Sequence, residues 1–260
     1  MSEKVKPYKD STLGKKEQVK NMFDAISQNY DGLNRVISLG IDLKWRKRVV
    51  AILKEKAPKT ILDIATGTGD LAIAMKATGA ERIVGLDISP GMLEVGKHKV
   101  AKKKLQDTVE MVVGDSENLS FEDNSFDAVT VAFGVRNFEN LERGLTEIYR
   151  VLKPEGSLVI LETSVPTRTP FKQGYGLYSK YILTGIGKLF SRDRSAYDYL
   201  SESASVFPHG QEFNNILAKI GFIGIENRHQ TFGVASIYVA TKEFDEKRPR
   251  SSRPSCANVH

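Results

Sequence analysis

Cysteine, histidine and long apolar runs are all scarce in this chain of 260 residues. The one cysteine, Cys256, lies in a polar stretch, so no disulfide can form within a single chain. No apolar run approaches the roughly 18 residues that a membrane-spanning helix needs, and no His, Cys, Asp and Glu cluster has metal-ligand spacing. Residues 1–20 lack the apolar stretch of a signal peptide. We therefore expect a cytoplasmic protein with no transmembrane helix and no metal site.

The positive charge of the chain is concentrated at its two ends. Of the formal net charge of +6, residues 1–20 contribute +3 and residues 243–260 contribute +1, which leaves +2 for everything between them. A lysine-rich run at residues 97–104 is typical of the solvated face of a helix. The composition therefore predicts no nucleic-acid partner.

Apolar strands alternate with helical segments through the middle of the chain. Strands are expected near residues 60–65, 81–87, 109–114, 126–133 and 156–163, followed by a hairpin of 222–227 and 235–241 at the sheet edge. This rhythm predicts an α/β fold with a Rossmann-like, doubly wound, mainly parallel sheet of seven strands. A helix near the N-terminus has one apolar face, formed by Val19, Met22, Phe23, Ile26 and Tyr30. A second helix, over residues 43–56, has Trp45, Val49, Ile52 and Leu53 facing inward, and we expect the N-terminal helical region to form a cap.

The ends of the chain and one internal segment depart from this pattern. We expect a polar flexible N-terminus over residues 1–17, a single domain over 18–242, and a disordered basic tail over 243–260. We expect residues 166–208 to form a helical insertion after the fifth strand, because apolar residues recur there at intervals of four: Tyr178, Ile182, Ile186 and Phe190. Two interpretations of the insertion are compatible with each other. It is a helix packed on the domain, or it is a lid that closes an apolar pocket and itself touches a membrane surface.

A glycine-rich turn follows the first expected strand. Gly67-Thr68-Gly69 lets a ligand approach the backbone, and the helix that begins at Asp70 offers free N–H groups. Asp87 ends the next strand, where a carboxylate can accept both hydroxyls of a ribose. The sequence therefore predicts a nucleoside-containing ligand at the carboxyl ends of the strands.

Two acids favour S-adenosylmethionine over a nicotinamide cofactor, although the relaxed glycine fingerprint fits both. Asp63, at the end of the first strand, suits the cationic amino-acid end of S-adenosylmethionine and would repel a pyrophosphate. Asp115, after the third strand, can accept a hydrogen bond from the adenine amino group. Each acid alone could equally cap a loop or helix.

A longer set of motifs extends over residues 18–241. It comprises Phe23-Asp24-Ala25-Ile26, Tyr30-Asp31, Asn34-Arg35, Trp45-Arg46, Asp87-Ile88-Ser89-Pro90-Gly91-Met92-Leu93, Phe133-Gly134-Val135-Arg136-Asn137, Arg150-Val151-Leu152-Lys153-Pro154 and Tyr197-Asp198-Tyr199-Leu200. On these residues the chain resembles the ubiquinone/menaquinone biosynthesis C-methyltransferases. The resemblance implies a class I methyltransferase fold and methylation of a ring carbon of a prenylated hydroquinone. It also implies donor contacts at Thr68, Asp87, Asp115 and Ser116.

The expected site combines both lines of reasoning. The donor site comprises Asp63, Gly67, Thr68, Gly69, Asp87, Asp115 and Ser116. Arg136 is the candidate that stabilises a developing phenolate, Asn137 could hold a ring oxygen, and Tyr30 could cover the pocket. The alternatives are a surface ion pair for Arg136 and core packing for Tyr30. All four histidines are expected to be structural, so no general base is assigned.

The acceptor is the main question that the sequence leaves open. The chain is most similar to family members that convert demethylmenaquinol into menaquinol, and a benzoquinol of ubiquinone biosynthesis is the alternative. A non-catalytic donor-binding subunit, a nicotinamide-dependent oxidoreductase and a nucleic-acid methyltransferase are less favoured rivals. A peripheral contact on the inner face of the cytoplasmic membrane and a homodimer are both compatible with the sequence, which decides neither.

Overall fold

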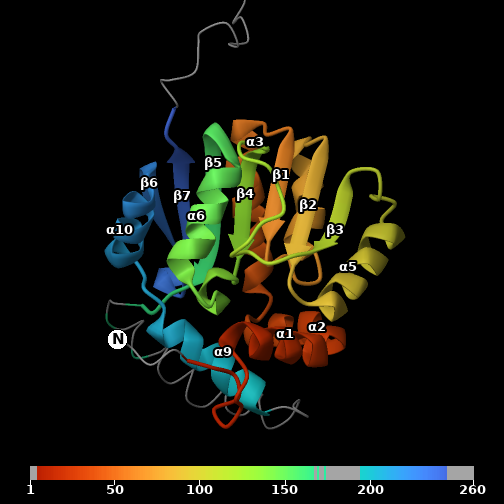
Figure 1. Cartoon of the computed structure of the whole chain (residues 1–260), viewed down its shortest axis with the longest axis vertical. Coiled ribbons are helices and arrows are strands. Elements are labelled where there is room, and N and C mark those ends of the chain that lie inside the picture. The colour runs from red at the N-terminus through yellow and green to blue at the C-terminus, as the bar shows by residue number, and fades with distance from the viewer. Residues whose placement is uncertain (1–4, 167–168, 170–172, 174–193, 245–260) are drawn as a thin grey trace, which may run out of the picture.

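The computed structural model describes residues 5–166, 169, 173 and 194–244, and Figure 1 shows how their elements are arranged. Residues 245–260 of the expected basic tail lie outside the described residues. So does most of the expected insertion, including Tyr178, Ile182, Ile186 and Phe190.

One sheet of seven strands forms the centre of the described structure, in the order β3-β2-β1-β4-β5-β7-β6. The strands are β1 (Thr60–Ile64), β2 (Arg82–Asp87), β3 (Val109–Val113), β4 (Phe126–Ala132), β5 (Leu152–Thr163), β6 (Phe222–Gln230) and β7 (Ala235–Lys242). The first five are parallel, and β7 pairs antiparallel with both β5 and β6. The expected doubly wound sheet and its hairpin at the edge are therefore confirmed. Because the strand order reverses between β1 and β4, a crevice opens at their carboxyl ends.

Strand β5 begins earlier than the sequence predicted. It starts at Leu152, which pairs with Phe126, whereas the next pair joins Ser157 to Ala128. Residues 153–156 therefore form a bulge opposite a single residue of β4.

Helices cover both faces of the sheet, and the strand pleat divides the core between them. One face packs against α3 (Ile41–Lys56), α4 (Asp70–Ala74) and α5 (Pro90–Lys102), and the other against α6 (Leu141–Val151) and α10 (Gln211–Ile220). Ile61 of β1 contributes to the first core, and its neighbour Leu62 contributes to the second. The residues expected to face inward from the second helix are all buried in α3: Trp45, Val49, Ile52 and Leu53.

A helical cap lies at the carboxyl ends of the strands, below the sheet in Figure 1. It comprises α1 (Lys15–Ile26), the 3-10 turn η1 (Ser27–Asn29), α2 (Tyr30–Ile37) and α9 (Arg194–Val206). Tyr30, expected on the face of the first helix, instead starts α2, because η1 divides the helical segment. Among the described residues, no helix combines the length and apolarity needed to cross a membrane.

The cap includes residues from the stretch 1–17 that we expected to be polar and flexible. α1 begins at Lys15, which is buried. Its Nζ donates to the carbonyl oxygens of Arg136 and Phe138, both at 3.0 Å, and these bonds fasten the start of α1 to the turn after β4.

Candidate active site

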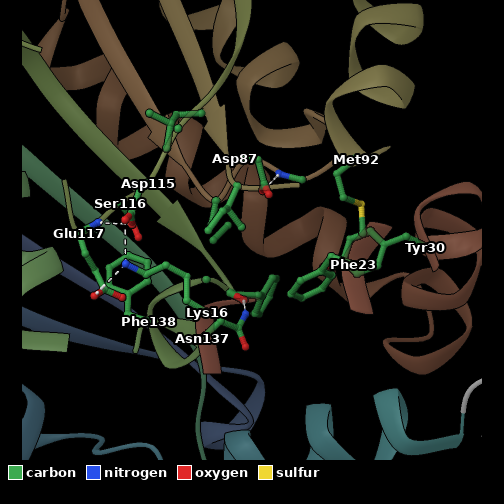
Figure 2. Close-up of a pocket in the computed structure, with 18 residues that line it drawn as sticks. Lys16, Phe23, Tyr30, Asp87, Met92, Asp115, Ser116, Glu117, Asn137 and Phe138 are labelled. Atoms are coloured by element: carbon green, nitrogen blue, oxygen red, sulfur yellow. Dashed lines mark hydrogen bonds and ion pairs between the residues drawn. The ribbon is translucent and has the colours of Figure 1, made fainter. Parts of the chain in front are cut away.

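Two adjoining cavities lie between the cap and the strand ends, and they share Tyr30 and Phe133. We call the first the strand-end cavity, because the turns after β1, β2, β3 and β4 line it together with α1 and the start of α5. Figure 2 shows the side chains around it. The second, the side cavity, lies between α2, α3, α9 and the end of β5.

Asp87, at the end of β2, is almost fully buried and lines the strand-end cavity. Its Oδ2 accepts the N–H of Gly67 at 2.8 Å, and its Oδ1 accepts the N–H of Ser89 at 2.9 Å. Burial raises the pKa of Asp87 to about 6, although the N–H groups of Ser89, Gly67 and Ile88 favour the charged form. Asp87 lines the cavity, so its carboxylate can accept further hydrogen bonds from a ligand there.

The two glycines of the turn have different surroundings, one at the cavity and one in the core. Both have positive φ, +58° at Gly67 and +78° at Gly69. Gly67 lines the cavity, and a Cβ atom there would lie 3.8 Å from Cε1 of Tyr30. A Cβ atom at Gly69 would instead lie 2.9 Å from Cε of Met111, so Gly69 makes room for core packing.

Thr68 and Asp63, both expected in the donor site, are not among the described residues that line the two cavities. The Thr68 hydroxyl donates to Oδ1 of Asp31 at 2.6 Å. Asp63 accepts hydroxyl hydrogen bonds from Thr66 and Thr130, each at 2.6 Å. Burial raises the pKa of Asp63 to about 6 against these two bonds. Both side chains are therefore engaged within the protein, where they hold the shape of the turn.

Asp115, Ser116 and Glu117 form the wall of the strand-end cavity after β3. Lys16 of α1 reaches this wall, with its Nζ 2.7 Å from Oδ2 of Asp115 and 3.4 Å from Oε2 of Glu117 (Figure 2). Burial opposes the charge of Lys16, but the two carboxylates outweigh burial and raise its pKa. We did not expect Lys16 in the site, and no local pattern marks it, because Asp115 lies 99 residues away.

Arg136 lines the side cavity and is buried, with a side chain only 8% exposed. Its Nη1 donates to the carbonyl oxygen of Phe133 at 3.0 Å and to Oε1 of Glu162. Burial alone would lower the pKa of Arg136, but Glu162 reverses the effect and raises it, so the guanidinium stays charged. The surface ion pair that we weighed for Arg136 is in fact a buried one. Arg46 adds a second cation to this cavity, 5.4 Å from the centre of the Phe133 ring.

Asn137 and Tyr30 lie where the two cavities meet. Asn137 lines the strand-end cavity, and its Oδ1 accepts a hydrogen bond from the hydroxyl of Tyr199 at 3.1 Å. Tyr30 lines both cavities, and burial raises the pKa of its hydroxyl, which bonds to Asn34. The three residues expected to be catalytic, Tyr30, Arg136 and Asn137, are therefore brought together around one boundary.

Residues 11–242 match the ubiE/COQ5 methyltransferase family. The chain belongs to this family. A demethylmenaquinone methyltransferase of Bacteroides fragilis is 49% identical over 242 residues, which cover 92% of this chain and 98% of the relative. The ubiquinone/menaquinone biosynthesis C-methyltransferase UbiE of Geotalea daltonii is 44% identical over 230 residues, covering 88% of this chain and 97% of the relative. The expected family and class of enzyme are therefore confirmed.

A solved structure supports the fold independently. Phosphoethanolamine N-methyltransferase 2 of Haemonchus contortus, in complex with S-adenosyl-L-methionine, superimposes with a TM-score of 0.54. It shares 22% identity, and the match covers 71% of this chain and 49% of that chain. At this identity the likeness shows the fold alone.

Four residues in or beside the cavities were missed in the sequence or left without a role. Lys16 and Arg46 line a cavity, whereas Glu162 and Tyr199 line neither and instead bond to the lining residues Arg136 and Asn137. Glu162 carried a usable signal, because it ends the apolar run of β5 as Asp63 and Asp87 end theirs. Among the described residues, no group of three or more His, Cys, Asp and Glu side chains could hold a metal ion.

Proposed function

We propose that this chain transfers a methyl group from S-adenosylmethionine to a ring carbon of a prenylated hydroquinone, converting a demethylmenaquinol into a menaquinol. The observation that carries the proposal is the pair of adjoining cavities, one with strand-end carboxylates and the other with a buried arginine. The similarity to the Bacteroides fragilis demethylmenaquinone methyltransferase supports this choice of acceptor.

The strand-end cavity suits the methyl donor. In the proposal, Asp87 accepts the two ribose hydroxyls, and Asp115 accepts the adenine amino group beside Ser116. Asp87, Asp115 and Glu117 outnumber Lys16 on its walls, so the cavity also suits a sulfonium cation. Gly67 lets the donor approach the backbone, while Asp63, Thr68 and Gly69 shape the turn from beneath.

The side cavity suits the acceptor ring. Methyl transfer from a sulfonium is an in-line displacement, so the ring carbon must be held against the methyl group. A ring carbon becomes nucleophilic as an adjacent hydroxyl loses its proton. Arg136 and Arg46 line this cavity, and a cation beside that oxygen stabilises the developing negative charge. Tyr30 and Asn137, at the boundary, would orient the ring toward the donor.

The proposal also covers membrane contact and the number of chains that the reaction needs. The prenyl tail of such an acceptor partitions into a bilayer, so we propose a peripheral contact with the membrane on its cytoplasmic side. The described residues of one chain line both cavities, so we propose that donor and acceptor bind within a single chain.

A prenylated benzoquinol is the second candidate acceptor. The name of the Geotalea daltonii relative covers both ubiquinone and menaquinone biosynthesis. The two rings differ in width, so a competition between them separates the candidates.

The test is methyl transfer from labelled S-adenosylmethionine to reduced demethylmenaquinol, in the presence of a prenylated benzoquinol. We expect label in the naphthoquinol, a loss of at least about 100-fold in kcat for Arg136→Ala, and an unchanged Kd for S-adenosylhomocysteine. Arg228→Ala, which removes an exposed arginine of β6, is the matched control and should keep full activity. Label in the benzoquinol alone would favour the second candidate. No label in either acceptor, with the donor bound, would contradict both.

A further inference from the structure

Glu162 is a fully buried carboxylate at the end of β5, directly beside Arg136. Its Oε1 accepts hydrogen bonds from Nη1 of Arg136, from the N–H of Thr163 at 2.8 Å and from the Thr163 hydroxyl at 3.1 Å. Its Oε2 is also buried and has no hydrogen-bond partner among the described residues. A buried carboxylate oxygen without a donor is unfavourable, and such groups concentrate at functional sites.

Arg136 also has a buried polar atom without a hydrogen-bond partner among the described residues. Its Nε–H is buried and, in the part of the chain that the structure describes, has no acceptor. The ion pair therefore leaves one acceptor, Oε2 of Glu162, and one donor, Nε of Arg136. A water molecule or a hydroxyl group, which both donates and accepts, is the chemical complement of such a pair.

The other charged groups around the side cavity are less suited to receive a proton. Asp42 lines the cavity, but its Oδ1 accepts the Ser38 hydroxyl at 2.7 Å and its Oδ2 is bonded to Arg35. Arg46, like Arg136, is a permanent cation and cannot take up a proton. Glu162 does not itself line the side cavity, but its partner Arg136 and its neighbour Thr163 do. Compared with Asp42, whose two oxygens are both engaged, Glu162 keeps one oxygen, Oε2, that accepts no hydrogen bond from the described residues.

We propose that Glu162 receives, through a bridging water molecule, the proton that the ring hydroxyl of the acceptor loses during methyl transfer. The inference rests on the proposed function. As the C–CH3 bond forms and the S–CH3 bond breaks, the O–H bond releases its proton toward Oε2. The methylated ring carbon then loses its hydrogen as a proton to solvent, and Glu162 returns its own proton to the ring oxygen. One proton is released for each methyl group transferred, and no redox partner is needed.

The groups that face Glu162 allow this role. Arg136 of η3 (Val135–Asn137) forms the ion pair with Glu162, while Tyr199 of α9 and Tyr238 of β7 are its phenolic neighbours. Burial raises the pKa of both phenols, so neither ionises near neutral pH to compete for the proton. Because Glu162 acts through Arg136 and water, we class it as a positioning and proton-holding residue.

The decisive experiment compares Glu162→Gln with the wild type on two acceptors. The first is reduced demethylmenaquinol, and the second is a ring-halogenated analogue whose hydroxyl is already ionised at the pH of the assay. We expect Glu162→Gln to lower kcat about 100-fold with the first acceptor and less than about 5-fold with the second. The acidic limb of the pH–kcat profile should disappear in the variant, and the Kd for S-adenosylhomocysteine should stay within twofold.

Two further variants separate this role from a structural one. Glu162→Asp keeps the carboxylate and should retain the acidic limb with an intermediate kcat, even if Glu162→Gln does not fold. Glu226→Gln, on the exposed face of β6, is the matched control and should behave as the wild type. Equal losses on both acceptors, or an unchanged pH profile in Glu162→Gln, would overturn the inference. A wild type that binds donor but methylates neither acceptor would instead overturn the proposed function.

Discussion

Asp63 and Asp87 occupy the same kind of place, at the ends of neighbouring parallel strands, yet they face different surroundings. Burial raises the pKa of each to about 6. Asp87 borders the strand-end cavity, whereas both oxygens of Asp63 are engaged by Thr66 and Thr130. One carboxylate is thus open to a ligand, and the other holds the turn.

The raised pKa of Asp63 makes a prediction about stability. A carboxyl whose pKa rises from 3.8 to about 6 on folding binds protons more tightly in the native state, so it favours the fold less as pH rises through that range. Relative to Asp63→Asn, the free energy of unfolding of the wild type should increase by about 1.4 kcal/mol between pH 8 and pH 5. Urea unfolding of both proteins at the two pH values measures this. If the difference in unfolding free energy between the two proteins is the same at both pH values, the prediction is wrong.

Asp87 makes a separate prediction about the donor. In the proposed function its ionised form accepts the ribose hydroxyls, so affinity for S-adenosylhomocysteine should be full above about pH 6 and fall below it. Asp87→Asn should raise the Kd at pH 8 by roughly 30-fold, because a hydrogen bond to a charged group contributes about 2 kcal/mol. It should also remove the pH dependence. Calorimetric titrations from pH 5 to pH 8 test both points, with the exposed Asp123→Asn as control.

At the scale of elements, α2 depends on charge more than on burial. Of its eight residues, all described, Leu33 alone is a buried hydrophobic residue. Five charged side chains hold the helix against α3, α4 and α5, and we call them the α2 clamp: Asp31, Arg35, Asp42, Asp70 and Lys99. Because α2 begins with Tyr30, the clamp also positions the ring that covers Gly67.

Removing Arg35 should therefore loosen the donor site without touching it. Arg35 pairs with both Asp42 and Asp70, so Arg35→Gln removes one cation from each of these two carboxylates, which keep Arg46 and Lys99 as their remaining partners. We expect the Kd for S-adenosylhomocysteine to rise about 10-fold, equivalent to about 1.4 kcal/mol. Calorimetry at fixed ionic strength measures this change.

The matched control is Arg82→Gln. It removes an exposed ion pair with Glu110 at the opposite end of the sheet. This variant should bind as the wild type does. If both variants bind equally well, the clamp does not position Tyr30.

Across the whole molecule, the two cavities share a wall, so their ligands should bind with positive coupling. Tyr30 and Phe133 line both cavities, and a donor in the strand-end cavity restricts their movement. The single tryptophan, Trp45, lies in the side cavity with its ring 6.1 Å from that of Phe133. Its fluorescence therefore reports on the acceptor site.

Titration of a demethylmenaquinol against Trp45 fluorescence should give about fivefold tighter binding when S-adenosylhomocysteine is present. Tyr30→Phe keeps the ring and should keep the coupling, whereas Tyr30→Ala should reduce it. Equal acceptor affinity with and without the donor would show that the shared wall does not couple the binding of the two ligands.

The sequence by itself determined the elements of the fold and the region of the site. Apolar runs and the turns between them are local properties, so the five parallel strands and the edge hairpin were predictable, as was the place of Asp87 at a strand end. The expected catalytic trio also lies together, because Arg136 and Asn137 adjoin a strand end and Tyr30 begins a cap helix.

Tertiary structure alone decided which side chains line a cavity and which hold the lining residues in place. Thr68 turns toward Asp31, which is 37 residues away, and Lys16 reaches Asp115 across 99 residues. Arg136 finds its carboxylate 26 residues later, in Glu162. These contacts join separate segments of the chain, and the direction of a side chain at a strand end depends on partners that only the packed fold brings near. The sequence located the glycine-rich turn, whereas packing placed Asp87 on the cavity wall, Asp63 against the threonines of the turn, and Glu162 against the arginine.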